Sequence, residues 1–426
     1  MKLERSKGTK DFLPEEQIIR NSIVTALRDV FEQFGFSPID TPSLEKYDIL
    51  SSKYTGGSEI LKEIFTLKDQ GDRSLGLRYD LTVPLARVIG LNPQIKMPFK
   101  RYQMGYVWRD GPVSLGRYRE FMQCDVDIIG CKTMLAETEL ITLTKTALEK
   151  LGFKAIIKIS NRKILDGILL SLGVKQSQIG PVILSIDKLE KFGVDTVKKE
   201  LSTQGIGREI VDKILDTISI KGTTDEKIEK LNDLLGSNEG LEEIRELFSY
   251  LEDFKSDVVF DISLARGLSY YTGTIFEVVL NNSRIKSSVV GGGRYDDMIG
   301  AFIGRGDFPA VGISFGLERL YDAYSERIDK KVKTVTQVYI IPINTVMSAL
   351  TVAKELRGQN ISADMDIMGR GPSKNLDYAN KMNIPFVIFL GEDEVKLEKV
   401  KIKDMASGEE KLIPVSEVKK FIESHE

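Results

Sequence analysis

The stretch from Phe99 to Gly130 holds the residues best suited to chemistry. In its second half, YREFMQCDVDIIG, polar and apolar side chains alternate, which is typical of a β-strand with one polar face. That face carries Phe121, Gln123 and Asp127. An aromatic ring beside an amide and a carboxylate could stack on a heterocycle and bond its polar atoms, although a simply solvated strand face shows the same alternation.

The first half, KRYQMGYVWRD, alternates in the same way and places Arg101, Gln103 and Arg109 on one side. The turn-rich loop DGPVSLG joins the two halves, entered by Arg109 and left by Arg117. We therefore predict two long antiparallel strands joined by an arginine-flanked loop. Because the planar guanidinium fork of arginine suits phosphate, the combination points to a nucleotide beside a small polar ligand.

A second group of polar residues lies in LARGLSYYTGTIFE, where Arg266 precedes Tyr270 and Tyr271. An arginine near a tight turn could reach a phosphate or carboxylate, and tyrosine hydroxyls suit a polar ring. The same residues would also fit an ordinary edge strand with cross-strand aromatic pairs. This segment alone does not decide between the two.

Two further segments are rich in glycine. VVGGGRYDDMIG contains Tyr295 and a glycine triplet that could let backbone approach a ligand or could make an ordinary turn. The triplet does not fit GxGxxG, so we exclude a dinucleotide-binding fold here. In PAVGISFGLERL, a strand meets a helix that begins near Leu317, and Arg319 lies in its first turn, where backbone donors favour anions.

Composition excludes several mechanisms. The chain has 426 residues, a single histidine at His425, and two cysteines, Cys124 and Cys131, which we expect to be buried or half-buried free thiols. A catalytic histidine, a histidine-ligated metal and a disulfide framework are therefore not expected. The net charge of -3 does not by itself indicate a nucleic-acid binder. No apolar run of about 18 residues and no secretory signal are evident, so we expect no membrane association and a cytoplasmic location.

The surrounding pattern indicates the elements that position these residues. A helix is predicted from Glu15 to Phe34, and in the following FSPIDTPSLE, Pro38 and Pro42 exclude a central strand, which leaves a sheet edge or a subunit interface. Residues 155–160 predict a strand, and about 170–251 a run of amphipathic helices. Strand-like sequence resumes at SDVVFDISL, and a short helix is predicted over 317–326.

After the charged linker IDKKVKT, strands and helices alternate to the end of the chain. This order predicts a small doubly wound α/β domain.

These segments, in this order, resemble class II aminoacyl-tRNA synthetases. FSPIDTPSLE resembles motif 1, Phe99 to Gly130 motif 2, and PAVGISFGLERL motif 3, while LARGLSYYTG and GGGRYDDM resemble the two signatures of the histidine enzyme. RGPSKNLDYAN, from Arg370 to Asn380, resembles its anticodon-binding domain. The implied fold class is α+β, a class II antiparallel-sheet catalytic core (1–169 and 252–327) with a helical insertion domain (170–251) and a C-terminal α/β anticodon-binding domain (328–426).

The resemblance implies roles for individual residues. Histidine would be bound by Asp80, Thr82, Arg109, Gln123, Asp127, Arg266, Tyr270, Tyr271 and Tyr295, with Asp80, Thr82 and Gln123 at the α-amino end and Asp127, Tyr271 and Tyr295 at the imidazole. ATP would be bound by Arg109, Arg117, Phe121 and Arg319, and the catalytic residues would be Arg109 and Arg266. One residue departs from the family pattern, because Gly111 stands where the family commonly has a carboxylate.

The implied activity is ATP-dependent formation of histidyl-adenylate, followed by transfer of histidine to tRNA(His), with Mg²⁺ as cofactor and a homodimer as the assembly. Neither the sequence nor the resemblance identifies the Mg²⁺ ligands. Two alternatives are a non-charging, histidine-binding regulatory paralogue of ATP phosphoribosyltransferase and an RNA sensor with an inactive site. The paralogue would lack the C-terminal domain and the LARGLSYY arginine, and the sensor would lose Arg109, Arg266 or Arg319; this sequence keeps all of these.

Overall fold

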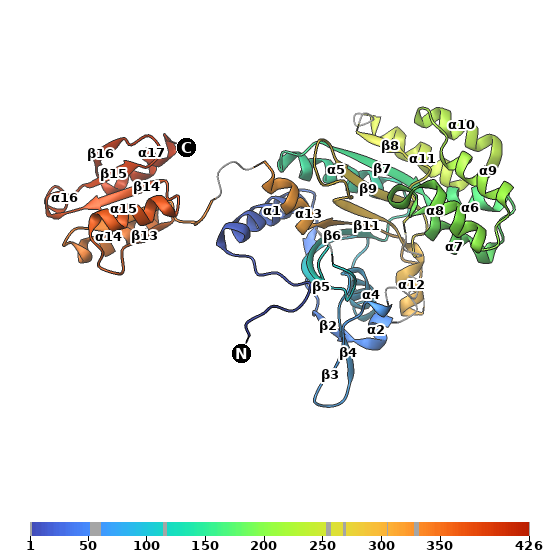
Figure 1. Cartoon of the computed structure of the whole chain (residues 1–426), viewed down its shortest axis with the longest axis horizontal. Coiled ribbons are helices and arrows are strands. Elements are labelled where there is room, and N and C mark those ends of the chain that lie inside the picture. The colour runs from blue at the N-terminus through green and yellow to red at the C-terminus, as the bar shows by residue number, and fades with distance from the viewer. Residues whose placement is uncertain are drawn as a thin grey trace. The chain divides into compact units, whose positions relative to one another are not determined.

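The structure is a computed structural model that describes residues 2–51, 61–113, 117–252, 257–266, 270–304, 306–327 and 332–425. Four segments named above lie partly outside the described residues: the motif 2 loop at 114–116, the first residue of SDVVFDISL at 256, the turn at 267–269 after Arg266, and the linker at 328–331. The chain divides into two compact units, a larger one of residues 1–10 and 23–327 and a smaller one of residues 11–22 and 328–426, and each is described by itself (Figure 1).

The larger unit is built on an eight-stranded sheet. In spatial order its strands are β1 (Ser37–Pro38), β5 (Phe99–Trp108), β6 (Glu120–Ile129), β11 (Ala310–Gly316), β10 (Val290–Arg294), β9 (Thr274–Leu280), β7 (Ala155–Asn161) and β8 (Val258–Phe260). Neighbours are antiparallel except for the outer pairs β1–β5 and β7–β8. The predicted α+β class and the long β5–β6 hairpin are thus confirmed.

One face of this sheet is apolar and carries the core. Helices α1 (Pro14–Gln33), α5 (Leu135–Lys150) and α13 (Leu317–Ser325) supply apolar side chains to the core of this unit. Phe31 of α1 is fully buried, and its ring lies 5.7 Å from that of Tyr102 and 5.5 Å from that of Phe315. Since side chains alternate along a strand, burial of this face leaves the polar set on the other face.

The position of β1 at the edge of the sheet agrees with the prediction that Pro38 excludes a central strand. Strand β1 includes Pro38 and pairs only with β5 among the described strands. Beside it lies a small sheet of β2 (Leu44–Lys46), β4 (Ser74–Leu77) and β3 (Thr66–Lys68). Helices α2 (Tyr47–Ser51), α4 (Thr82–Leu91) and α12 (Asp296–Ile303) form one apolar cluster with residues of the large sheet.

Six helices are inserted between β7 and β8 and gather at that end of the sheet (Figure 1). They are α6 (Arg162–Ser171), α7 (Gln176–Ile186), α8 (Leu189–Thr203), α9 (Arg208–Ile218), α10 (Thr224–Leu235) and α11 (Glu239–Tyr250). The first begins at Arg162 because the side chain of Asn161 accepts from the backbone N–H of Lys163 (2.9 Å) as a helix cap. Helix α6 thus precedes the predicted boundary at 170, and that boundary stays a prediction.

Within the described residues, no single helix is long and apolar enough to cross a membrane. The pair α6 and α7, bent by 118°, is long and apolar enough by length and composition only.

The smaller unit has a five-stranded sheet in the order β13 (Ala363–Met365), β12 (Val338–Pro342), β14 (Phe386–Leu390), β15 (Val400–Asp404), β16 (Glu410–Ile413). Its helices are α14 (Val346–Gly358), α15 (Pro372–Lys381), α16 (Glu392–Lys396), a 3₁₀ turn η2 (Val415–Glu417) and α17 (Val418–Glu423). Strand β12 is parallel to both β13 and β14, and α14 and α15 pack in separate apolar clusters that use alternate residues of β12. The predicted doubly wound unit is confirmed (Figure 1).

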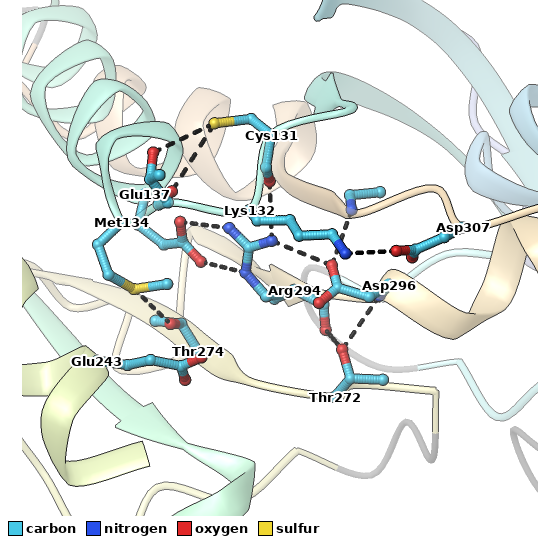
Figure 2. Close-up of polar contacts among 12 residues, drawn as sticks. Cys131, Lys132, Met134, Glu137, Glu243, Thr272, Thr274, Arg294, Asp296 and Asp307 are labelled. Carbon is cyan, nitrogen blue, oxygen red and sulfur yellow. Dashed lines mark hydrogen bonds and ion pairs between the residues drawn. The ribbon is translucent and has the colours of Figure 1, made fainter. Parts of the chain in front are cut away.

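A buried ion pair joins the large sheet to α5 (Figure 2). Arg294, at the end of β10, donates through Nε and Nη2 to the carboxylate of Glu137, both at 2.7 Å, and the two side chains are 2% and 0% exposed. Its Nη1 donates to the carbonyl of Cys131 (3.0 Å) and to Asp296 Oδ1 (3.1 Å). One guanidinium therefore holds β10, α12, the end of β6 and α5 together. Of the two free thiols, Cys124 is buried and Cys131 half-buried, as predicted.

We expect Glu137→Gln to lower the free energy of unfolding of the larger unit by about 3–5 kcal/mol, because it removes the buried, two-bonded carboxylate partner of Arg294 and leaves only the more exposed Asp296. The only tryptophan of the chain, Trp108, lies on β5 in this unit, so its fluorescence in urea reports the unfolding. The control is Glu209→Gln, which breaks an exposed pair with Lys213 (2.7 Å) and should change nothing measurable. Equal free energies of unfolding for the Glu137→Gln variant and the parent would contradict this expectation.

Candidate active site

The polar face of the large sheet forms the floor of the candidate site. Cross-strand neighbours on β5, β6, β11 and β10 form one row, Arg101, Asp127, Gly312 and Gly293, and a second row, Gln103, Asp125, Ser314 and Gly291. Because the rows are two residues apart along each strand, all these positions share one face. In both rows β5 and β6 supply functional side chains, and β10 supplies a glycine.

Asp127 lies at the centre of the first row. Its Oδ2 is 2.7 Å from Nη2 of Arg101, and the hydroxyl of Tyr295 donates to its Oδ1. Burial raises the pKa of Asp127, whereas the positive charge of Arg101 and the bond from Tyr295 oppose that rise. Gly312 makes this arrangement possible, because a Cβ at that position would collide with the Asp127 carboxylate.

Three tyrosines gather beside this carboxylate. The ring of Tyr270 lies 4.9 Å from that of Tyr271 and 6.3 Å from that of Tyr295. Tyr271 lies across Gly293, where an added Cβ would be 2.8 Å from its Cδ1. An ionisable acceptor surrounded by phenol groups can bind a polar ring that carries N–H donors.

Asp80 and Thr82 approach the same floor from the start of α4, whose first residue is Thr82. Asp80 is buried, and its Oδ1 accepts from the backbone N–H of Val83 (3.0 Å). Burial raises the pKa of Asp80, while that hydrogen bond and the charges of Arg109 and Arg101 oppose the rise. Asp80 and Asp127 thus interact with the same buried cation, Arg101.

Gln123 and Asp125 complete the polar residues of β6. Nε2 of Gln123 donates to Oγ of Ser314 (2.9 Å). Burial raises the pKa of Asp125 to about 7; the charge of Arg101 opposes this rise, and the negative charge of Asp127 adds to it. Asp125 and Ser314 received no role in the sequence analysis, although the alternation of β6 already placed Asp125 between Gln123 and Asp127.

At the side of the site defined by motifs 2 and 3, four arginines approach each other: Arg109, Arg117, Arg266 and Arg319. Nε of Arg109 donates to the carbonyl of Tyr79 (2.9 Å), and its guanidinium lies 5.2 Å from the centre of the Phe121 ring. Arg319 donates to the carbonyl of Ser288 (2.5 Å).

The electrostatics of Arg319 show how closely these arginines approach. Burial lowers the pKa of Arg319, and the positive charges of Arg266, Arg117 and Arg109 lower it further. The negative charge of Glu277 opposes this fall. Among the described residues, no carboxylate forms an ion pair with Arg109 or Arg319. Mutually repelling, partly buried cations are the arrangement that a polyanion would stabilise.

Arg266 differs from these two because it has a carboxylate partner. Its Nη1 is 2.9 Å from Oε1 of Glu277, and the guanidinium lies across Gly291, where a Cβ would collide with it. Burial lowers the pKa of Arg266, but Tyr271, Glu277 and Tyr270 raise it more, so the net shift is upward. The side chain is therefore held flat on the floor, between the tyrosines and the other arginines.

The unexpected glycine of motif 2 has a steric explanation. A Cβ at Gly111 would lie 2.6 Å from Oε1 of Glu63, so the carboxylate of Glu63 occupies the space beside position 111. The backbone carbonyl of Glu63 accepts from the N–H of Asp110 (2.8 Å), and its carboxylate is 3.5 Å from Arg117. A carboxylate is therefore present at this point of motif 2, supplied by a different segment. The sequence alone did not reveal it, because 63 and 111 are far apart along the chain.

The sequence analysis also gave no structural role in the site to Arg101 or Arg78. Arg78 is buried, and it donates to the carbonyls of Tyr106 (2.8 Å) and Thr41 (2.5 Å), which joins β5 to the motif 1 segment. Burial lowers the pKa of Arg78. A register prediction for the β5–β6 hairpin could have paired Arg101 with Asp127, but no local pattern indicates the contacts of Arg78.

This antiparallel sheet, with arginines at motifs 2 and 3 on one face, defines a class II aminoacyl-tRNA synthetase core. The family model described as histidyl-tRNA synthetase matches residues 8–320, and an anticodon-binding domain model matches 337–425. The chain belongs to the histidyl-tRNA synthetase family.

Individual relatives agree with this family. Histidine–tRNA ligase 1 of Bacillus cereus is 44% identical over 98% of this chain and 97% of its own length, and the ligase of Bacteroides fragilis is 38% identical over 97% of each. A crystal structure of histidyl-tRNA synthetase from Nostoc, 31% identical, matches all of both chains with a TM-score of 0.88. An ATP phosphoribosyltransferase regulatory subunit/histidyl-tRNA synthetase from Bacillus halodurans shares the fold at 22% identity and a TM-score of 0.77.

We expect Gly312→Ala to weaken histidine binding by tenfold or more, about 1.4 kcal/mol, because its methyl group displaces the Asp127 carboxylate. The control is Gly180→Ala on α7, outside the site, where an added Cβ would meet nothing within 4 Å. Isothermal titration of histidine into both variants measures the difference. Equal affinities in the two folded variants would show that Asp127 need not lie where it does.

Proposed function

We propose that the chain activates L-histidine with ATP to histidyl-adenylate and transfers the histidyl group to the 3′ end of tRNA(His), releasing diphosphate and AMP. The observation that supports this most strongly is the sharing of one sheet face by two groups of residues. The buried Asp127 with its tyrosines suits an imidazole, and the converging arginines beside it suit a triphosphate.

Histidine would lie along β6. Its imidazole would meet Asp127, Tyr270, Tyr271 and Tyr295, where a carboxylate and hydroxyls match the N–H and lone pair of the ring. The α-ammonium would meet Asp80, Thr82 and Gln123. A site built from buried polar groups rejects isosteres that leave those groups unpaired.

The first step needs no protein nucleophile. A carboxylate oxygen of histidine attacks the α-phosphorus of ATP, a new P–O bond forms, and the bond to the bridging oxygen breaks so that diphosphate leaves. Arg109 and Arg266 would hold the carboxylate against the α-phosphate and stabilise the negative charge that develops there. In the second step a terminal ribose hydroxyl of the tRNA attacks the acyl carbon, and AMP leaves.

ATP would be held by Arg109, Arg117, Phe121 and Arg319, with adenine on the ring of Phe121 and the phosphates near the guanidiniums. We treat Mg²⁺ as part of the substrate, bound to the phosphates. Among the described residues, no group of three or more His, Cys, Asp or Glu side chains could hold a metal ion, which agrees with an ion that takes most of its ligands from phosphate and water.

The C-terminal unit would bind the anticodon of tRNA(His), in keeping with the domain model that it matches. We further propose a homodimer formed through the motif 1 region. Pro38 lies at an open sheet edge, and Leu44 and Leu67 of the adjoining small sheet are exposed apolar side chains that a second copy could cover. We place the reaction in the cytoplasm, where tRNA is charged.

The regulatory-paralogue alternative has no support beyond a shared fold. Arg266 and the C-terminal unit, which such a paralogue would lack, are both present. The curated relatives named above, which are at least 38% identical over 97% or more of this chain, are histidine–tRNA ligases.

Aminoacylation of a mixed tRNA pool with labelled histidine tests the proposed function directly. We expect label to appear in tRNA(His) only, and to depend on ATP. A non-charging paralogue would bind histidine without labelling any tRNA, and an RNA sensor would bind tRNA without either activity. Either outcome would contradict the proposal.

Arg266→Ala should reduce histidine-dependent ATP–pyrophosphate exchange by about 10³-fold or more, because the guanidinium would act on charge that develops in the transition state. The matched control is Arg245→Ala on α11, where the arginine is exposed. Both variants should retain the melting temperature of the parent to within a few degrees. Near-normal exchange in a folded Arg266→Ala variant would remove this residue from the mechanism.

A further inference from the structure

Gln123 holds its amide in a definite direction on the floor of the site. Its Nε2 donates to Oγ of Ser314 (2.9 Å), while its Oε1 is buried and accepts from no donor among the described residues. A buried carbonyl oxygen without a donor is costly, so a bound donor would stabilise it. The α-ammonium of an amino acid is such a donor.

The direction of this amide depends on the hydroxyl of Ser314. A hydroxyl has one hydrogen to donate. Once that hydrogen is donated to one neighbour, the hydroxyl oxygen can only accept a hydrogen bond from another. Ser314 is the cross-strand partner of Asp125, which places its hydroxyl beside that carboxylate. Oδ1 of Asp125 is buried and has no hydrogen-bond donor among the described residues, and the nearby Ser314 hydroxyl lowers the Asp125 pKa against the larger effect of burial. An ionised carboxylate only accepts, so it would attract the Ser314 hydrogen and leave the hydroxyl oxygen to accept from Gln123.

We propose that Asp125 is a positioning residue for amino-acid recognition, which acts through Ser314 to turn the carbonyl oxygen of Gln123 toward the α-ammonium of the substrate. This inference rests on the proposed function and deepens it, because it adds a residue that acts through Gln123 and not on the substrate itself. The path is short, because Gln123 bonds to Ser314 and Asp125 lies directly across from Ser314 on β6.

The surroundings of Asp125 favour an ionised carboxylate once a cation is bound. The charged and titratable groups that interact with it are Arg101, Arg78, Asp127, Asp80 and Tyr271. Asp80, Asp125 and Asp127 bring three carboxyl groups to the buried floor, where the arginines that interact with them are Arg101, Arg78 and Arg109. The positive α-ammonium would add to these cations and favour the ionised form of Asp125.

The test uses the Asp125→Asn variant of the full chain at pH 8, above the Asp125 pKa of about 7. The asparagine amide can donate to Ser314, so the hydroxyl donates to Gln123 instead, and the Gln123 amide turns its NH₂ group toward the ammonium. Affinities are measured by titration calorimetry for histidine and for 3-(imidazol-4-yl)propionate, the same molecule without the α-amino group. We expect the preference for histidine over this analogue to fall by about 10- to 100-fold, while the analogue binds the variant and the parent alike.

Two further variants separate positioning from a general loss of structure. Asp127→Asn, two residues along the same face, should weaken both ligands together and keep their ratio, because both carry the imidazole. Adding Gln123→Glu to Asp125→Asn should restore the preference, because a carboxylate accepts in either orientation. Should Asp125→Asn fail to fold, Ser314→Ala removes the hydroxyl that links Asp125 to Gln123. It should lower the preference for histidine over the analogue in the same way.

An unchanged ratio in a folded Asp125→Asn variant, or no recovery with Gln123→Glu, would overturn the role of Asp125. Failure of the parent itself to bind histidine would instead contradict the proposed function, so the two ideas fail in different ways.

Discussion

The ion pair between Arg101 and Asp127 is the interaction on which the rest of the site depends. Both side chains are almost completely buried, and a buried charge is tolerated only when a partner compensates for its lost hydration. The pair joins β5 to β6, and the hydroxyl of Tyr295 connects the same carboxylate to the end of β10. A charged acceptor can therefore stay at the centre of the floor in the absence of substrate, ready for a ligand with N–H donors.

Glycine imposes the second constraint, because side chains must lie flat on the floor for a substrate to fit above it. The floor positions without a side chain are Gly105, Gly291, Gly293, Gly312 and Gly316. The first four have neighbours that a Cβ would strike: Arg78, Arg266, Tyr271 and Asp127, respectively. In the glycine triplet of the second histidine signature, Gly291 and Gly293 are thus explained by close approach of side chains, and Gly292 by close approach of the β11 backbone at Gly312.

Local patterns in the sequence were enough to predict most of the helices and strands and part of the site. Alternation along β5 and β6 placed Gln123 and Asp127 on one face, because the period of a strand is a local property. The start of α6 was missed although Asn161 is a typical helix cap. The partners of Asp127, Arg294 and Gly111 depend on segments far apart in the chain; Arg294 and Glu137, for example, are 157 residues apart. No periodicity encodes such contacts, so they required the fold.

Consecutive residues at the end of β10 connect the site to the core. Arg294 points to α5 and pairs with Glu137, whereas Tyr295 points to the opposite face and donates to Asp127 (Figure 2 shows the Arg294 side). A movement of Tyr295 away from Asp127 would therefore strain the buried ion pair behind it. Since both contacts join residues more than 150 positions apart, the floor of the site exists only when the whole unit is folded. A ligand that binds Asp127 must then stabilise the unit as a whole, by mass action on its global unfolding equilibrium and not on a local loop.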